Sequence, residues 1–328
     1  MKAVLVKAPG DASQLYIGDA PTPLVGDHEV LVKIQSFGLN RMDILQREGR
    51  YPPPPGVTEI LGVEMAGVIE KVGPKVTLHA VGDHVCGLMK GGAYAEYCVI
   101  HEELAFAIPE GFTPQQAAAI PEVWITAYQA LHKVGELKAN QDVLIHAGAS
   151  GVGLAAIQLA KLAGARNICV TAGSDEKLRT CKEMGATVTI NYRTQRWLDV
   201  VMEHTQQRGV DMIIDFVCAD YWNDNLHALA RDGHMVMLAT LSGGKVTEGN
   251  LAPILAKRLR IQGSTLRSRS LEYQIELARD VRRDLLPLLA SGALRVVIDK
   301  EYPWSEIAEA HRRMEKNLNV GKIVVNVE

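Results

Sequence analysis

The fold of this chain is decided by residues 142–160, which read DVLIHAGASGVGLAAIQLA. A short apolar run at residues 143–145 leads into a glycine loop and then into small and apolar residues typical of a buried helix. A glycine turn between a strand and a helix turns backbone N–H groups toward a pyrophosphate, and the helix dipole favours its charge. The stretch therefore predicts a dinucleotide site formed by Gly148, Ala149, Ser150, Gly151, Val152 and Gly153.

The glycine loop departs from the usual G-x-G-x-x-G fingerprint at its middle position. When Gly148 and Gly153 are aligned with the outer glycines, Ser150 takes the middle place. We expect its hydroxyl to contact phosphate. The alternative is a purely structural turn, and the strand before the loop and the helix after it argue against that.

The residues on either side of the loop show two different patterns. Apolar runs at 168–171, 188–190, 212–214 and 235–238 alternate with helical stretches, as in a doubly wound parallel sheet. Before residue 123 the chain holds 11 of the 14 prolines and short strand-like runs. We predict an α/β fold with a mostly β domain at 1–122, a Rossmann domain at 123–262, and a return segment at 263–328 that completes the first domain.

Composition limits the classes of partner. The chain has 328 residues and a formal net charge of −3, so no basic surface for nucleic acid or anionic lipid is indicated. No segment reaches the length of a membrane span, and the N-terminus lacks the apolar stretch of a signal peptide. We expect a cytoplasmic protein with small-molecule partners. The five cysteines are odd in number and without paired spacing, which indicates packing rather than disulfides or zinc.

The choice of nicotinamide cofactor depends on the end of the second strand of the Rossmann domain. An NAD enzyme places an acidic residue there to bind the ribose hydroxyls. This chain has Gly173 and Ser174, with Lys177 one turn into the next helix, so a 2′-phosphate would meet a hydroxyl and a cation. NADPH is favoured. The alternative is that Ser174 only caps the helix, and Asp175 is the residue that would favour NADH.

Over nearly its whole length the chain resembles the zinc-free quinone oxidoreductase branch of the medium-chain dehydrogenase/reductases. The segments that carry the resemblance include the glycine loop and residues 39–43, 49–52, 61–64, 82–83, 121–127, 171–174, 191–192 and 319–322. Zinc-dependent relatives hold their catalytic metal with a cysteine where this chain has Leu39 and Asn40, and with a histidine where it has Val63. The lobe that binds their structural zinc is also missing. The resemblance therefore implies a metal-free active site.

The resemblance also implies roles for residues outside the glycine loop. It places Asn40 and Tyr51 beside the nicotinamide and the substrate, as catalytic residues that donate hydrogen bonds to the substrate oxygen. Asn40 also counts among the cofactor contacts. The other implied cofactor-binding residues are Thr126, Gly173, Ser174, Lys177, Tyr192, Cys218, Leu241, Thr265, Leu266 and Asn319. Simpler interpretations stay open: Tyr51 as a loop aromatic, Asn40 as a hydrogen bonder at a strand end, and Cys218 as a packing residue rather than a reactive thiol.

Three functions remain open at this point. The first is reduction of quinones by NADPH, and the second is reduction of the double bond of enones or enals, which uses the same hydride and the same oxygen contacts. The third is an NADPH-binding redox sensor with little turnover. The residues suggest no metal, serine–histidine–aspartate arrangement or paired carboxylate, so the cofactor has to supply the reactivity. The branch usually forms homodimers, and we expect one here.

Overall fold

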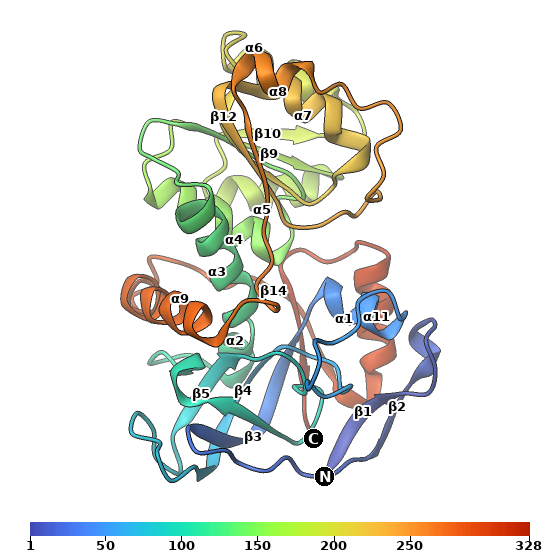
Figure 1. The fold of residues 1–328 in the computed structure, drawn as a ribbon, viewed down its shortest axis with the longest axis vertical. Helices are drawn as coiled ribbons and strands as arrows, with labels where there is room; N and C mark the ends of the chain where they lie inside the picture. The colour runs from blue at the N-terminus through green and yellow to red at the C-terminus, as the bar shows by residue number, and fades with distance from the viewer. The chain divides into compact units, whose positions relative to one another are not determined.

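The chain folds into two compact units, seen in a computed structural model that describes residues 1–328 (Figure 1). The first unit consists of Met1–Ile125 together with Leu266–Glu328, and the second consists of Thr126–Thr265. The second unit is therefore continuous in sequence, while the first is built from both ends of the chain. Both termini lie in the first unit.

The second unit is organised around a six-stranded sheet whose neighbouring strands all run parallel. In spatial order the strands are β10 (Val188–Asn191), β9 (Asn167–Ala172), β8 (Asp142–Ile145), β11 (Val210–Asp215), β12 (Leu229–Met237) and β13 (Arg260–Gly263). Every residue of β8 is buried, as a strand covered on both faces requires. The chain winds outward from β8 in both directions, which is the Rossmann arrangement, and the predicted fold class is confirmed.

Helices connect the parallel strands of the second unit. They are α4 (Gly151–Leu162), α5 (Asp175–Met184), α6 (Trp197–His204), η4 (Ala219–Tyr221), α7 (Trp222–Ala228) and α8 (Ala252–Lys257), while η3 (Gln129–Val134) precedes β8. Helix α3 (Pro121–Tyr128) contains the break between the two units. A parallel pair needs a crossover of this kind because its second strand must start at the same end as the first.

The first unit contains a mostly antiparallel seven-stranded sheet and a two-stranded ribbon. The sheet has the order β14 (Ile298–Pro303), β15 (Lys322–Asn326), β3 (Glu29–Leu39), β4 (Glu64–Val72), β5 (His84–Leu88) and β7 (Ala105–Ala107), and β6 (Tyr97–His101) pairs with β3. The ribbon pairs β1 (Lys2–Val6) with β2 (Leu15–Asp19). Because β15 pairs with β3, the C-terminal segment extends the sheet that the N-terminal residues begin.

Short helices surround this sheet. They are η1 (Ala12–Gln14), α1 (Arg41–Arg47), η2 (Glu102–Leu104), α2 (Pro114–Ala118), α9 (Leu271–Asp284), α10 (Leu286–Ala290), η5 (Trp304–Glu306) and α11 (Ile307–Glu315). The 3-10 turn η5 leads directly into α11. The charged run at 279–284 forms the last part of α9, where Arg279 and Arg283 are exposed.

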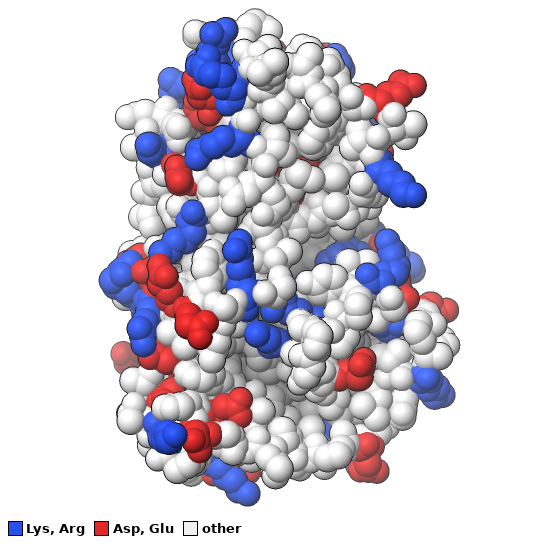
Figure 2. All heavy atoms as spheres, viewed as in Figure 1, with Lys and Arg blue, Asp and Glu red and all other residues white.

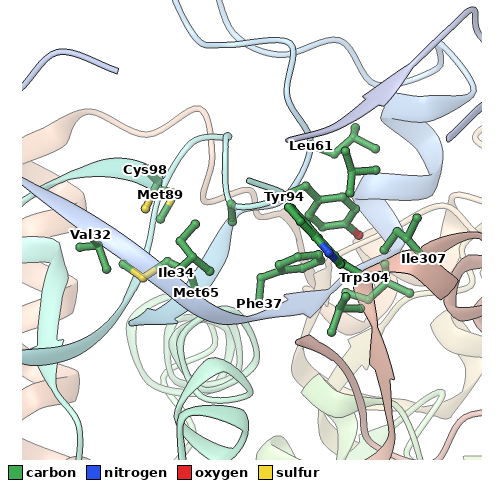
Figure 3. Close-up of a cluster of buried hydrophobic side chains, with 14 of the residues drawn as sticks. Val32, Ile34, Phe37, Leu61, Met65, Met89, Tyr94, Cys98, Trp304 and Ile307 are labelled. Atoms are coloured by element: carbon green, nitrogen blue, oxygen red, sulfur yellow. The ribbon is translucent and has the colours of Figure 1, made fainter. Parts of the chain in front are cut away.

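The core of the first unit gathers apolar side chains from both ends of the chain, as Figure 3 shows. Phe37 on β3 stacks on Tyr94, with 4.4 Å between ring centroids. Trp304 and Ile307 reach the same cluster from the C-terminal segment. Burial of this apolar surface is the main favourable term in folding, so the N- and C-terminal parts of the unit stabilise one another.

The distribution of surface charge and the burial of the cysteines agree with the sequence analysis. On the face shown in Figure 2, acidic and basic side chains are interspersed. None of the helices combines the length and the apolar character that crossing a membrane requires. All five cysteines are unpaired by disulfides and buried. Burial raises the pKa of the Cys86, Cys169 and Cys181 thiols to about 12, as expected for packing residues.

Candidate functional site: two half-sites

The predicted glycine loop lies between the end of β8 and the start of α4. Ser150 caps this helix: its Oγ accepts a hydrogen bond of 3.0 Å from the backbone N–H of Gly153. A methyl group on Gly148 would lie 1.8 Å from Val170 Cγ1, and one on Gly153 would lie 2.5 Å from the carbonyl oxygen of Gly148. The glycines are therefore required by the packing of β8, β9 and α4 on one another. They leave the N-terminus of α4 without covering side chains of their own.

The residues predicted to bind the 2′-phosphate lie together at the ends of β9 and β10. Ser174 caps α5 and accepts from the backbone N–H of Lys177 at 3.3 Å. A methyl group on Gly173 would lie 2.7 Å from the hydroxyl oxygen of Tyr192 and 3.4 Å from Nε of Arg193. Tyr192 and Arg193 thus lie beside Gly173. Arg193 is a second cation here, one that the sequence analysis did not identify.

Asp175, the residue that would have favoured NADH, is engaged elsewhere. Its Oδ1 accepts a hydrogen bond of 2.8 Å from Nδ2 of Asn191, the last residue of β10. This contact ties the start of α5 to the neighbouring strand. The carboxylate therefore has a structural partner, and the alternative in which it binds a ribose loses support.

Two further loops complete the carboxyl-end edge of the sheet. The residues after β11 and β12 pair through backbone hydrogen bonds, with the N–H of Leu241 donating to the carbonyl of Phe216 at 3.0 Å. Cys218 lies in the first of these loops with φ +73°, a conformation rare for residues other than glycine. Its N–H donates to the Asp215 carboxylate, and burial raises the pKa of its thiol. Ligands of doubly wound sheets bind at this edge.

In the first unit, Asn40 belongs to a buried polar cluster with Glu64 and Lys322. Asn40 Nδ2 donates to Glu64 Oε1 at 2.8 Å, and Lys322 Nζ donates to Asn40 Oδ1 at 2.8 Å and to Glu64 Oε1 at 2.5 Å. The other oxygen of Glu64 accepts from the backbone N–H of Glu122 at 2.8 Å. Both charged side chains are almost completely buried. The cluster fixes the amide plane of Asn40 and leaves one Nδ2 proton for a further acceptor.

A second buried network lies behind Asn40. Arg47 can only donate, so His311 Nδ1 accepts from its Nη1 at 3.1 Å, and the imidazole proton must lie on Nε2. That proton faces the Tyr94 hydroxyl at 3.2 Å, and the hydroxyl donates to Asp43 Oδ2 at 3.2 Å. Asp43 Oδ2 also accepts from the backbone N–H of Asn40. Burial lowers the pKa of His311 to about 3 and raises that of Asp43 to about 6.

Tyr51 lies in the segment between α1 and β4, which has no helix or strand. Its ring is half-buried and lies over the guanidinium of Arg267, with Cζ 5.6 Å from the ring centroid. Burial raises the pKa of the Tyr51 phenol, and the positive charge of Arg267 offsets part of this rise. The phenol therefore stays protonated at neutral pH and can donate a hydrogen bond.

The other residues implied by the resemblance are divided between the two units. Thr126 lies in α3, and Thr265 ends the second unit, where its carbonyl accepts from Gln129 Nε2 at 3.4 Å. Leu266 begins the return to the first unit, and its carbonyl accepts from Gln274 Nε2 at 2.9 Å. Asn319 lies near β15 and donates to the carbonyl of Gly321 at 3.0 Å. Their contact with a cofactor stays a prediction.

The residues at the zinc positions of the wider family do not fit that metal. Leu39 and Val63 are apolar and buried, and Glu64, the carboxylate that follows Val63, is bound by Lys322. No group of three or more histidine, cysteine, aspartate or glutamate side chains could hold a metal ion. Zinc prefers three or four nitrogen, sulfur or oxygen ligands.

Four contributors to the two half-sites were missed at the sequence level: Glu64, Lys322, Arg193 and Arg267. A signal existed for the first pair. Glu64 and Lys322 are charged residues at the first position of a strand, each followed directly by an apolar run, and buried charges in such positions require a partner. Arg193 directly follows Tyr192 at the end of the strand next to β9, where a second cation for a phosphate would be sought. Nothing in the sequence singles out Arg267.

Comparison with known proteins assigns the family. The profile of the zinc-binding dehydrogenase family matches residues 151–281, and that of the alcohol dehydrogenase GroES-like domain matches residues 26–110. The quinone oxidoreductase of Lama guanicoe is 31% identical over 99% of this chain and 97% of its own. Escherichia coli quinone oxidoreductase, solved with NADPH, superposes with a TM-score of 0.90 at 30% identity over 99% of this chain and 100% of its own. The JamJ enoyl reductase gives a TM-score of 0.88 at 26% identity over 100% of this chain and 99% of its own.

A parallel Rossmann sheet with a glycine loop, joined to a separate mostly β unit, defines a nicotinamide-dependent oxidoreductase. The chain belongs to the quinone oxidoreductase branch of the medium-chain dehydrogenase/reductase family, which confirms the resemblance drawn from its sequence.

Proposed function

We propose that this protein is an NADPH-dependent quinone reductase. The second unit would hold the cofactor with the loop at 148–153 and with Gly173, Ser174, Lys177 and Tyr192, and these residues fit a dinucleotide because the loop leads into the N-terminus of α4, whose backbone N–H groups and dipole favour phosphate. Arg193 joins this set from the structure. When bound, NADPH supplies a hydride. Two cations and a helix N-terminus would all favour the negative charge of the 2′-phosphate, which NADH lacks. This is the reason for choosing NADPH over NADH.

The first unit would hold the acceptor through neutral hydrogen-bond donors. Asn40 presents its remaining Nδ2 proton from a fixed amide, and Tyr51 presents its phenolic proton. Donors held in place before the reaction stabilise negative charge that develops on the acceptor oxygen. Asn40 is also the N-terminal cap residue of α1. Hydrogen bonding at the end of a strand is therefore compatible with its proposed role.

The observation that carries the proposal is the character of this donor pair. Neither side chain is a strong acid, and the one carboxyl beside them with a raised pKa, Asp43, is buried and engaged by Tyr94 and the backbone of Asn40. Quinones suit such a site because they accept hydride readily, and their reduced oxygens can take protons from water. The likeness to quinone oxidoreductases over the whole chain supports the same choice.

The test removes one donor while keeping its ring. Tyr51→Phe should lower kcat and kcat/KM with an ortho- and a para-quinone by roughly tenfold, the low end of the range for such donors. NADPH affinity, measured by fluorescence titration, should not change. Tyr16→Phe, an exposed tyrosine of β2, is the matched control and should behave as the wild type. Unchanged turnover of Tyr51→Phe with both quinones would remove Tyr51 from the mechanism.

Reduction of enones is the second candidate, and the likeness to the JamJ enoyl reductase favours it. The same two donors could hold the carbonyl oxygen of a conjugated enone. Comparing kcat/KM for an ortho-quinone and for a linear enal under the same conditions decides between the two. A higher value for the enal would replace the quinone assignment. Binding of NADPH without turnover of either would favour the redox sensor.

We further propose a cytoplasmic homodimer joined through the second unit. Strand β13 is the edge of the six-stranded sheet and has a partner on one side only. An unpaired edge is suited to adding a strand from a second copy. Light scattering on the purified protein should give twice the mass of the chain, and Gln262→Pro in β13 should give the mass of one chain.

A further inference from the structure

Arg267 is a buried cation that the proposed mechanism does not use. It follows the second unit in the chain and packs into the first, where only 6% of its surface is exposed. Its Nε donates to the carbonyl of Lys90 at 2.6 Å, and its Nη1 donates to Gln46 Oε1 at 2.9 Å. The ring of Tyr51 covers the guanidinium. These contacts tie the guanidinium to α1, to the loop after β5 and to the proposed substrate donor.

The third nitrogen of this guanidinium is different, because Nη2 is buried and has no hydrogen-bond partner. The two groups that accept from Arg267 are neutral, and no carboxylate contacts it. Asp43 and Glu122 act on it only through longer-range attraction. A buried charge without a matching partner is costly, and the cost falls when an acceptor of opposite charge binds. The orphaned donor therefore indicates a ligand with a negatively charged oxygen.

In this conformation the side of Nη2 that faces Gly91 is closed by the segment between α1 and β4. A methyl group on Gly91 would lie 3.4 Å from Nη2 and 3.0 Å from Val57 Cγ1, so the missing side chain at Gly91 borders the orphaned nitrogen. Val57 belongs to the segment between α1 and β4, which also carries Tyr51 and has no helix or strand. Gly49 and Gly56 in this segment adopt positive φ angles. A displacement of this segment would open Nη2 to a ligand held by Tyr51.

We propose that Arg267 Nη2 binds an anionic substituent of the acceptor, so that the site selects conjugated carbonyl compounds that carry a carboxylate or a comparably charged oxygen. This inference rests on the proposed function, because it takes the acceptor as the ligand. Arg267 is then a specificity residue: it contacts the substrate away from the carbon that accepts the hydride. A neutral quinone would still be reduced, with weaker binding.

Binding of a non-reducible probe pair tests the inference without relying on turnover. Naphthalenesulfonate and the neutral naphthalenesulfonamide are titrated calorimetrically into the full chain, with and without saturating NADP⁺. The wild type should bind the sulfonate about tenfold or more tightly than the sulfonamide, as a charge-assisted hydrogen bond requires. Arg267→Gln should bind both equally. Arg50→Gln removes an exposed charge next to Tyr51 and should keep the wild-type preference.

A second variant covers the case in which Arg267→Gln fails to fold. Gly91→Ala keeps the guanidinium but places a methyl group 3.4 Å from Nη2, in the path of an approaching anion, so it should weaken binding of the sulfonate selectively. Gly91 does not adopt a positive φ, so the backbone accepts alanine there. An unchanged preference for the sulfonate in Gly91→Ala and in folded Arg267→Gln would overturn the inference. Equal wild-type affinities for the two probes would do the same.

Two further results would distinguish this inference from binding of the cofactor at Nη2 and from the proposed quinone reductase function. If Arg267→Gln weakened NADP⁺ binding but kept the sulfonate preference, the cofactor would be the ligand of Nη2, and the inference would be wrong. Turnover of an ortho-naphthoquinone and of its sulfonated analogue tests the proposed function separately. A wild type that preferred the sulfonate but reduced neither quinone would support the anion site while overturning the quinone reductase assignment.

Discussion

In the second unit, the groups that meet in the glycine loop, Ser150 and Gly153, are 3 residues apart in the chain, whereas in the first unit Asn40 and Lys322 are 282 residues apart. The proposed cofactor half-site is made of helix caps and glycines whose partners are close in sequence. The proposed acceptor half-site is made of buried charges whose partners come from opposite ends of the chain. Local geometry therefore specifies the first, and the completed fold specifies the second.

The difference predicts how each half-site responds to substitution. A helix cap contributes on the order of 1 kcal/mol, because water can replace much of a lost partner. A buried charge that loses its partner cannot be rehydrated without opening the core. Substitutions in the first unit should therefore affect stability most, and those in the cofactor half-site should affect binding as well.

The largest effect is expected for Lys322→Met. It leaves the fully buried carboxylate of Glu64 without its cation, and breaking a buried pair in this way typically costs about 3–5 kcal/mol. Urea unfolding measures the loss. Lys75→Met, which breaks the exposed pair with Asp27, should cost less than about 1 kcal/mol.

The double variant Lys322→Met with Glu64→Gln makes the comparison sharper. If the uncompensated charge causes the loss, neutralising Glu64 should restore part of the stability. A double variant as unstable as Lys322→Met would show that packing, and not charge, dominates at this position.

Gly148→Ala should break the cofactor half-site by a purely local clash. Its methyl group would lie 1.8 Å from Val170 Cγ1, and overpacking of this kind typically costs about 1–3 kcal/mol. We expect lower thermal stability together with weaker NADPH binding. Adding Val170→Ala removes the contact and should recover both. No recovery would mean that the backbone of the loop, and not this neighbour, demands glycine.

Lys177→Ala and Arg193→Ala test the proposed 2′-phosphate site. A charge-assisted hydrogen bond is worth about 1.5–3 kcal/mol, so each change should weaken NADPH binding by roughly ten- to a hundredfold and leave NADH binding nearly unchanged. Fluorescence titration with both cofactors measures this. Lys182→Ala, in the last turn of α5, is the control. Equal losses for NADPH and NADH would contradict the assignment.

The effect that is smallest at neutral pH concerns His311. The folded state binds fewer protons at this residue than the unfolded chain between pH 6.5 and about 3, so His311 removes stability as the pH falls through that window. Asp43 acts in the opposite sense, because its pKa is raised from 3.8 to about 6 and its protonation favours the folded state as the pH falls.

Replacing His311 removes one of these two opposing contributions. Relative to the wild type, His311→Gln should gain up to about 1.4 kcal/mol per pH unit between pH 6.5 and about 3, since one pKa unit corresponds to that amount. Urea unfolding at several pH values measures the difference. Parallel pH profiles for the two proteins would show that His311 does not titrate on unfolding.

The sequence predicted the second unit better than the first, because the second depends on local patterns and the first on contacts between distant parts of the chain. The runs at 143–145, 168–171 and 188–190 are buried strands in a parallel sheet, where a continuous apolar run is diagnostic. In the first unit the mostly β character was predicted, but no pattern revealed that Lys322 on β15 lies against Glu64 on β4. Asn40 and Tyr51 came from family resemblance. The contacts that hold them depend on strand order, which residue spacing does not encode.

Because the second unit is inserted into the first, the last part of the first unit is synthesised after the whole of the second. All of Thr126–Thr265 has been made before β15, which pairs with β3 and carries the counter-charge of Glu64. Domains generally fold as units while the chain emerges. The cofactor unit, although encoded later than the first half of its neighbour, can be complete first. A ribosome that pauses before residue 322 would hold a finished Rossmann unit attached to an unfinished sheet.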